Sequence, residues 1–426
     1  MRIRGFRYGL SSCAAVLLAA CGGGSPPIVA PGTSVQSSSR GDGSANLPLA
    51  SSSYQVLHRF GPYANASHDH GGANPDAGLI EVNGTLYGTT SGGGYNDSGT
   101  VYSISATGVK KLVYGFRGAK SGDGSDPSGD LTDVNGTLYG TTYSGGKCDF
   151  GTVYSVSTTG TEKVLYSFCG LNVGPTGGVI DVNGTLYGST TADTIGGAVY
   201  SISTNGAYKV LYQFPEHSNR QGGGPIGRLL DVNGTLYGVT AYGGAYCYNN
   251  AGCGTVYSVT TSGKEKLLYS FKGWQDKSYL DGWLPLSGLI DVNGTLYGTT
   301  NDGGLSGCTA GCGVVYSITT SGQENVLYRF TGGSDGGNPD AALLEVSGTL
   351  YGTTADGGSA GDGTVFSMST SGGEQVLHGF GGGSDGADPQ ADLIDVNGSL
   401  YGTTYAGGFK SACSGKGCGT VFALLP

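Results

Sequence analysis

Both tryptophans of the chain lie in one short segment, KGWQDKSYLDGWLPLSG, together with a tyrosine. The aromatic residues are Trp274, Tyr279 and Trp283, and the carboxylates of Asp276 and Asp281 stand among them. Aromatic rings flanked by carboxylates suit sugar rings or apolar peptide side chains as ligands. The alternative is that the loop buries its own rings as a plug. We predict Trp274, Tyr279 and Trp283 as ligand-binding residues.

Aspartates are concentrated in four other segments, where their carboxylate oxygens could hold Ca²⁺. The groups are Asp335 with Asp340, Asp385 with Asp388 and Asp392, Asp69 with Asp76, and Asp123 with Asp126 and Asp130. None of these segments matches an EF-hand loop, and Asp and Gly are also the ordinary turn-forming residues. We therefore predict no cofactor, with Ca²⁺ on Asp335, Asp385 and Asp388 as the alternative.

His68 and His70, on either side of Asp69, form the only close histidine pair of the chain. Two histidines in a loop are a candidate pair of transition-metal ligands, and the alternative is that they are ordinary loop residues. The sequence contains no nucleophile elbow, no zinc-binding His-Glu helix motif and no phosphate-binding Gly loop between a strand and a helix. Catalytic residues therefore stay unassigned.

The chain that carries these residues is built from one repeated unit. The block VNGTLYGTT, or a close variant, recurs with its tyrosine at Tyr87, Tyr139, Tyr187, Tyr237, Tyr297, Tyr351 and Tyr401. The block GTVYSIS has its aromatic residue at Tyr102, Tyr154, Tyr200, Tyr257, Tyr316, Phe366 and Phe422. The block KVLYSF ends at Phe60, Phe116, Phe168, Phe214, Phe271, Phe330 and Phe380. Each unit of about 50 residues predicts four short strands, with Asn-Gly as a type I′ turn between the first two.

The phase of the repeat predicts how the fold closes. The repeated region begins with a lone fourth strand, residues 54–60, and ends with strands one to three, residues 391–424. Complementary ends would close a ring and remove exposed sheet edges, whereas an open solenoid would need capping repeats. We predict an all-β fold, a seven-bladed β-propeller over residues 54–426. Its N-terminal strand completes the C-terminal blade in a 3+1 seam.

The repeat resembles a known family through its LYGTT, GG and GTVF segments and through VLYSF. It is similar to the GloVer-type tandem repeat of bacterial surface and secreted proteins, across residues 54–424. The resemblance implies a β-propeller-like repeat. It implies little about function, because the biochemical role of that family is undefined.

Residues that repeat in every blade are needed by the fold, whereas residues that occur once can serve function. An acidic residue ends each predicted first strand, and we expect it to accept hydrogen bonds from the following turn. These residues are Glu81, Asp133, Asp181, Asp231, Asp291, Glu345 and Asp395. Asp130 and Asp392, at the mouths of their first strands, are a carboxylate pair that could act on glycans. The sequence does not give their separation.

Eight cysteines follow the N-terminal segment, and an even number in an exported chain predicts disulfides. The loops between second and third strands contain three pairs, Cys247 with Cys253, Cys308 with Cys312, and Cys413 with Cys418. Cys148 and Cys169 are expected at the same end of neighbouring strands and form the fourth pair. The alternative is a zinc site shared by the first two of these loops.

The N-terminus has the pattern of an exported lipoprotein. Residues 1–20 combine an arginine-rich start with an apolar stretch too short to span a bilayer, and they end in LAAC. This is similar to a bacterial lipobox, which implies cleavage before Cys21 and lipidation of Cys21. Gly22 fits outer-membrane sorting. The alternative is an ordinary secretory peptide. Residues 22–53 are rich in Gly, Ser and Pro and predict a flexible tether.

Composition narrows the function further. The formal net charge is −10, which argues against nucleic acid as a partner. The chain has 85 glycines, but aromatic and β-branched residues recur between them, so we predict turns rather than disorder. We predict a monomeric binding module. It would be anchored in the outer membrane by a lipid on Cys21, and the side of the membrane on which it lies is not assigned. Its ligand would be a glycan or a protein on the face of the long loops. The alternative is a propeller enzyme, a hydrolase or lyase acting on polysaccharide.

Overall fold

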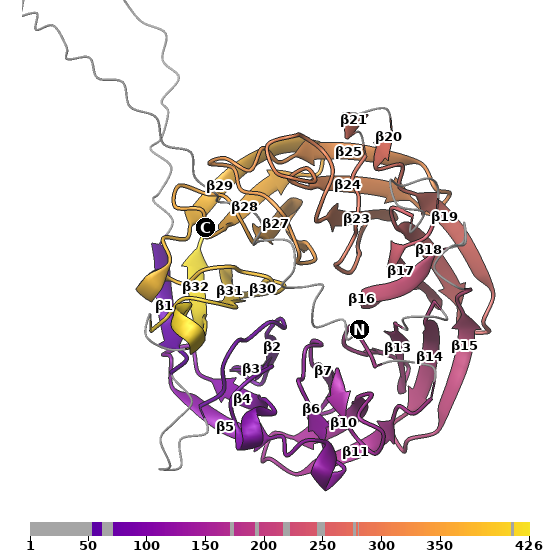
Figure 1. Ribbon diagram of the computed structural model, residues 1–426, viewed down its shortest axis with the longest axis vertical. Helices are drawn as coiled ribbons and strands as arrows, with labels where there is room; N and C mark the ends of the chain where they lie inside the picture. Colours follow the sequence, from indigo (N-terminus) through magenta and orange to yellow (C-terminus); the bar gives the residue numbers. More distant parts are fainter. Residues whose placement is uncertain are drawn as a thin grey trace, which may run out of the picture. The chain divides into compact units, whose positions relative to one another are not determined.

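The computed structural model describes residues 53–61, 71–170, 174–191, 196–215, 222–244, 252–275, 278–279, 281–409 and 413–426. Four-stranded antiparallel sheets succeed one another around a ring, which Figure 1 shows face on. The fold is therefore the predicted all-β, seven-bladed propeller. Residues 1–50 form a separate unit, which lies outside the described residues.

The strands of each blade are given in order from the centre of the ring outward. The first four blades are β2 (Ile80–Val82), β3 (Thr85–Thr90), β4 (Thr100–Ile104) and β5 (Lys110–Gly115); β7 (Thr132–Val134), β8 (Thr137–Thr142), β10 (Thr152–Ser157) and β11 (Glu162–Ser167); β12 (Ile180–Val182), β13 (Thr185–Thr190), β14 (Ala198–Ser203) and β15 (Tyr208–Gln213); and β16 (Gly223–Val232), β17 (Thr235–Tyr242), β18 (Thr255–Thr260) and β19 (Glu265–Ser270).

The last three blades are β22 (Ile290–Val292), β23 (Thr295–Thr300), β24 (Val314–Thr319) and β25 (Glu324–Arg329); β26 (Leu344–Val346), β27 (Thr349–Thr354), β28 (Thr364–Ser369) and β29 (Gly372–Gly379); and β30 (Ile394–Val396), β31 (Ser399–Thr404), β32 (Thr420–Leu425) and β1 (Ser53–Arg59). Small elements lie in the connectors: β6 (Gly124–Ser125) with β9 (Ser144–Gly145), β20 (Trp274–Gln275) with β21 (Ser278–Tyr279), and the 3₁₀ turns η2 (Tyr95–Asp97), η3 (Ala119–Ser121), η4 (Gly383–Asp385) and η5 (Cys413–Gly415).

The seam that closes the ring is the predicted one. Strand β1 pairs antiparallel with β32, with Tyr54 opposite Leu424, and the Phe60 amide donates to Gly419 O at 3.0 Å. Tyr54 also stacks on His378 of the preceding blade, with ring centroids 3.7 Å apart. The first strand of the domain thus joins the last blade to its neighbour.

Local sequence explains the hairpins between first and second strands. In the first blade, Asn83 has φ 51° and Gly84 has φ 78°, as a type I′ turn requires. The sixth blade has Ser347 in the Asn position with φ 53°. The Asn-Gly repeats therefore act as turns, as predicted.

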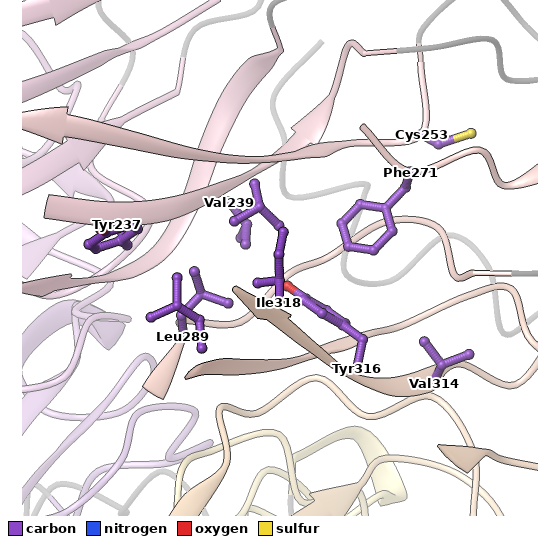
Figure 2. Packing of buried hydrophobic residues seen from close by; sticks show 10 residues of the cluster. Tyr237, Val239, Cys253, Phe271, Leu289, Val314, Tyr316 and Ile318 are labelled. Atoms are coloured by element: carbon purple, nitrogen blue, oxygen red, sulfur yellow. The ribbon is translucent and has the colours of Figure 1, made fainter. Parts of the chain in front are cut away.

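The hydrophobic core is divided among the interfaces between blades. Figure 2 shows one of them, where Phe271 of one blade and Tyr316 of the next lie together; their ring centroids are 5.1 Å apart in an edge-on contact. An aromatic contact of this kind recurs at every interface, for example between Phe60 and Tyr102 and between Phe116 and Tyr154. These rings are fully buried, and each offset pair adds about 0.5–1.5 kcal/mol beyond area burial.

Disulfides join Cys148 to Cys169, Cys308 to Cys312 and Cys413 to Cys418, as predicted. Cys253 is also disulfide-bonded, and its predicted partner Cys247 lies outside the described residues. The alternative zinc site is wrong, because these disulfides leave no thiolate on Cys253, Cys308 or Cys312 to bind the metal. Disulfides indicate an extracellular or periplasmic location. Within the described ranges, no helix is long and apolar enough to cross a membrane.

Candidate functional site

One position of the repeat differs sharply between blades and lies at the inner end of the sheets. It stands three residues before the acidic residue of each first strand, and its occupants are Gly78, Asp130, Gly178, Arg228, Gly288, Ala342 and Asp392. Four blades have Gly or Ala at this ring position, and three have a charged side chain. Figure 1 shows that the first strands, such as β2, β7, β16 and β30, surround the centre of the ring. The three charged residues therefore belong to the segments that surround the centre of the ring.

Asp130 and Asp392 each reach back to the preceding blade. The Gly78 amide donates to Asp130 Oδ1 at 2.6 Å, and the Ala342 amide donates to Asp392 Oδ1 at 2.7 Å. A Cβ atom on Gly78 would lie 3.0 Å from Asp130 Oδ1 and 3.3 Å from the Asp392 Cβ. The two carboxylates meet over Gly78 because that residue has no side chain.

The contact between the two carboxylates changes the protonation of one of them. Burial, followed by the negative charge of the neighbouring Asp130 side chain, raises the pKa of Asp392 to about 7. The Ala342 amide and the Arg228 charge oppose this rise in the pKa. At neutral pH the pair therefore holds a proton for much of the time, although both side chains keep partial contact with solvent.

Arg228 brings the third charge to the same place. Its Nη2 donates to Thr132 Oγ1 at 2.9 Å, so the side chain crosses the third blade, where the ring position is Gly178. Thr132 follows Asp130 by two residues in the chain. The Arg228 Nε atom is buried and has no hydrogen-bond partner. Among the described contacts, no ion pair joins Arg228 to either aspartate. Its guanidinium therefore keeps donors that a ligand could use.

The predicted aromatic segment lies in the connector that leads to Gly288. Trp274 and Tyr279 pair across the short β20–β21 hairpin, and nothing is described of their side chains. Trp283 exchanges two backbone hydrogen bonds with Asp302, at 2.9 and 3.0 Å, and its ring packs on the core of Figure 2. A ligand contact with these three aromatic residues stays a prediction.

The axial charges and this connector lie close together. A Cβ atom on Gly288 would lie 2.8 Å from Arg228 O and 3.5 Å from the Arg228 Cβ. Connectors from fourth strands arrive where first strands begin, so the aromatic segment and the charged ring positions belong to the same face of the propeller. The predicted aromatic residues and the three charged ring positions thus share one face.

The aspartates weighed as Ca²⁺ ligands have partners in their own loops. Asp335 accepts from Tyr328 Oη at 3.0 Å, Asp385 from the Gly381 amide at 2.7 Å, and Asp388 from Gln390 Nε2 at 2.9 Å. In the described part of the chain, no three His, Cys, Asp or Glu side chains are grouped to hold a metal ion. His68 and His70 lie outside the described residues.

The contact between Tyr328 and Asp335 recurs in two other connectors. Tyrosines of fourth strands donate to connector aspartates, as Tyr114 does to Asp123 at 2.8 Å and Tyr269 to Asp281 at 2.5 Å. Asp281, predicted beside the tryptophans as part of a ligand platform, is buried and also accepts from the Lys272 amide at 3.1 Å. These aspartates stabilise the fold of their connectors.

The sevenfold acidic residue is part of the scaffold, as predicted. In the second and fourth blades Asp133 accepts from the Gly136 amide at 2.9 Å, and Asp231 accepts from the Gly234 amide at 3.0 Å. Sequence reasoning missed Arg228. Comparison of the seven units at the ring position alone would have shown that this residue is unique.

Several carboxyl groups make stability depend on pH. Burial, followed by a neighbouring aspartate, raises the pKa of Glu162, Glu374 and Asp302 to about 7, as for Asp392. The folded state therefore favours their protonated forms. The free energy of unfolding decreases as the pH rises through 7, because these carboxyl groups must then ionise while buried. His378 acts oppositely, because burial lowers its pKa, but only below its ordinary value of 6.5. Above pH 6.5 the carboxyl groups therefore determine whether the protein becomes more or less stable as the pH rises.

We expect the melting temperature to fall by about 3 °C between pH 6 and pH 8, after allowing for solvent screening of the partly exposed groups. Differential scanning calorimetry at pH 6, 7 and 8 measures this change. The Glu374→Gln variant, which cannot ionise at that position, is expected to lose part of the slope. A melting temperature that is constant or rises with pH would contradict these pKa assignments.

Comparisons with known proteins bear on the fold and family. The model of the Gloeobacter/Verrucomicrobia repeat matches residues 32–195, 173–310 and 305–426. None of the curated proteins compared with the chain matches it.

Solved structures that resemble the chain do so at low sequence identity. A quinohemoprotein alcohol dehydrogenase from Comamonas testosteroni is 12% identical over 88% of this chain and 76% of its own, with a TM-score of 0.48. A luciferin-regenerating enzyme is 12% identical over 88% and 95%, with a TM-score of 0.42. A putative gluconolactonase is 13% identical over 71% and 89%, with a TM-score of 0.39. We draw no conclusion about function from these likenesses.

Proposed function

The chain belongs to the Gloeobacter/Verrucomicrobia repeat family, and on this premise we propose that it is a binding module of the cell envelope whose ligand sits at the propeller axis. One observation carries the proposal. In a ring of near-identical blades, Asp130, Arg228 and Asp392 are the charged exceptions at a position otherwise held by Gly or Ala. A scaffold with such pseudo-symmetry can form a unique site only where blades differ.

The surroundings support a ligand that is a glycan or a protein segment. Each aspartate uses one carboxylate oxygen to accept a backbone amide, which leaves oxygens that can accept from ligand hydroxyl or amide groups. We propose that Trp274, Tyr279 and Trp283 add an aromatic wall on the same face. The ligand would then meet polar groups at the axis and rings at the rim.

The carboxylate pair favours binding over glycoside hydrolysis. Two-carboxylate glycosidases hold their carboxyl groups about 5 Å or more apart, to leave room for a nucleophile or a water molecule. Asp130 and Asp392 instead lie side by side over Gly78, where an added Cβ atom would be 3.0 Å from Asp130 Oδ1 and 3.3 Å from the Asp392 Cβ. A pair that shares a proton suits recognition of hydroxyl groups, and we assign no catalytic residue.

We also propose that a lipid on Cys21 holds the module at the outer membrane and that residues 22–53 act as its tether. The disulfides support export, because they form in oxidising compartments. Cys21 lies outside the described residues. Fractionation tests this proposal: the Cys21→Ala protein is expected in the soluble fraction, and its retention in washed membranes would contradict the anchor.

The axial site is tested by substitution once an array of glycans and peptides has supplied a ligand. Asp130→Asn is expected to weaken binding about tenfold or more, because it removes a charged hydrogen-bond acceptor and disturbs the contact with Asp392. Isothermal titration calorimetry measures the affinity. The matched control is Asp133→Asn, which makes the same chemical change three residues later, at a scaffold position in β7.

Two outcomes would contradict the axial site. One is unchanged affinity of Asp130→Asn at an unchanged melting temperature, and the other is equal loss in Asp133→Asn. The double variant Trp274→Ala/Trp283→Ala reports on the aromatic wall, and we expect it to weaken binding about tenfold. Loss in that double variant alone would move the site to the connector.

A further inference from the structure

Among the described contacts Arg228 forms no ion pair, and we infer that it binds a carboxylate group of the ligand, so that the axial site recognises an acidic sugar unit of the uronate type. The inference rests on the proposed function, since it names the chemistry of the ligand at that site.

The Arg228 guanidinium makes one hydrogen bond among the described contacts. An arginine has five N–H donors in a planar fork, and here one nitrogen, Nη2, donates to the Thr132 hydroxyl. The buried Nε atom has no partner. The guanidinium N–H groups that make no hydrogen bond in the described structure are donors that an acceptor on a ligand can use. A carboxylate fits best, because its two oxygens match two parallel N–H groups of the fork.

The Thr132 contact fixes the direction of the fork. Thr132 is 5% exposed, and its hydroxyl in turn donates to Val179 O at 2.5 Å. The hydroxyl thus has a defined orientation, with its oxygen turned to Arg228. A guanidinium positioned in this way has lost rotational freedom before any ligand arrives, which reduces the entropic cost of binding.

The neighbouring charges select a monoanion. When the aspartate pair holds its proton it carries one negative charge, which the positive charge of Arg228 balances. A single carboxylate can pair with Arg228 without an excess of negative charge. A doubly charged phosphate would place its second charge beside Asp130 and Asp392, where like charges repel. The site therefore favours a carboxylate over a phosphate.

The same aspartates require hydroxyl groups on the ligand. Oδ1 of each carboxylate accepts a backbone amide, so the second oxygen of each side chain faces the ligand or the shared proton. A ligand with hydroxyl groups near its carboxylate would donate to these oxygens, whereas a simple fatty acid would leave them unpaired. Uronate units combine both groups on one ring.

The test compares glycans that differ only in charge. An array of uronate-containing oligosaccharides, their neutral counterparts and phosphorylated sugars is probed with the mature protein, and binding is expected on the uronates. For the strongest uronate, calorimetry then compares the free acid with its methyl ester, which keeps the ring and removes the charge. We expect the ester to bind at least tenfold more weakly. Arg228→Gln should bind acid and ester equally, and Arg228→Lys should keep part of the preference.

Each outcome separates this inference from the proposed function. Binding to neutral or phosphorylated glycans in place of uronates, no binding to any uronate, or equal affinity for acid and ester overturns the carboxylate inference. If the neutral glycans then lose affinity in Asp130→Asn, the axial binding site still stands. If the bound glycans keep their affinity in Asp130→Asn, Asp392→Asn and Arg228→Gln, at unchanged melting temperatures, both proposals fall.

Discussion

Deletion of residues 53–60 is expected to abolish cooperative folding of the propeller. These residues form β1, which supplies the outer strand of the last blade and contacts both of its neighbours. Phe60 is fully buried and packs edge-on against Tyr102 of the first blade, while Tyr54 stacks on His378 of the sixth. Without residues 53–60 the ring loses aromatic contacts at two blade interfaces and exposes the edge of β32, which promotes aggregation. Near-ultraviolet circular dichroism during heating measures the loss.

The control for this deletion removes most of the predicted tether and leaves the propeller strands in place. A chain that lacks residues 22–50 keeps β1 and is expected to melt within about 2 °C of the full chain, because a tether makes no core contacts. Addition of a synthetic peptide of residues 53–61 to the chain without β1 should restore part of the signal. A cooperative transition in the chain without β1, at the normal temperature, would contradict the role of the seam.

Replacement of Gly140 by Ala is expected to lower the free energy of unfolding by about 2–3 kcal/mol. Gly140 lies opposite Tyr154 in the β8–β10 pair, and the Tyr154 ring folds over it. A Cβ atom there would lie 2.5 Å from Tyr154 Oη and 2.6 Å from Tyr154 Cζ. The ring is fully buried between blades, so it cannot move aside without disturbing the interface with Phe116.

The matched control is Gly379→Ala in β29. An added Cβ on Gly379 would meet its nearest atoms at 3.7 Å, which is ordinary van der Waals contact. Denaturant unfolding is expected to show little change for this variant and a lower midpoint for Gly140→Ala. Equal midpoints in the two variants would show that the aromatic ring does not require the glycine.

The fold could be predicted because every signal occurs seven times. The Asn-Gly turns, the aromatic blocks and the phase of the repeat all point to the same blades, and the lone strand at residues 54–60 identifies the seam. Each of these features can be recognised from residues that are close together in the sequence. The disulfide of Cys308 with Cys312 follows in the same way, because both residues lie in one loop.

The candidate site depends on contacts that pass around the ring, and these could be predicted only in part. Asp130 and Asp392 could be paired from the closure of the ring, but their close approach depends on the missing side chain of Gly78. Arg228 reaches Thr132 across an entire blade, which no local pattern indicates. The aspartates weighed as Ca²⁺ ligands looked alike in sequence, yet Asp335 is a partner of Tyr328 in its own blade.

The central claim is that the ligand binds where Asp130, Arg228 and Asp392 meet, and hydrogen exchange with and without the array-identified ligand tests it most directly. We expect the ligand to slow exchange in the peptides that contain these three residues, which are far apart in the chain and come together only at the axis. Peptides of the outer strands, such as β11 and β25, should be unchanged. Protection confined to the outer strands, or absent from all three axial peptides while the ligand is bound, would contradict the claim.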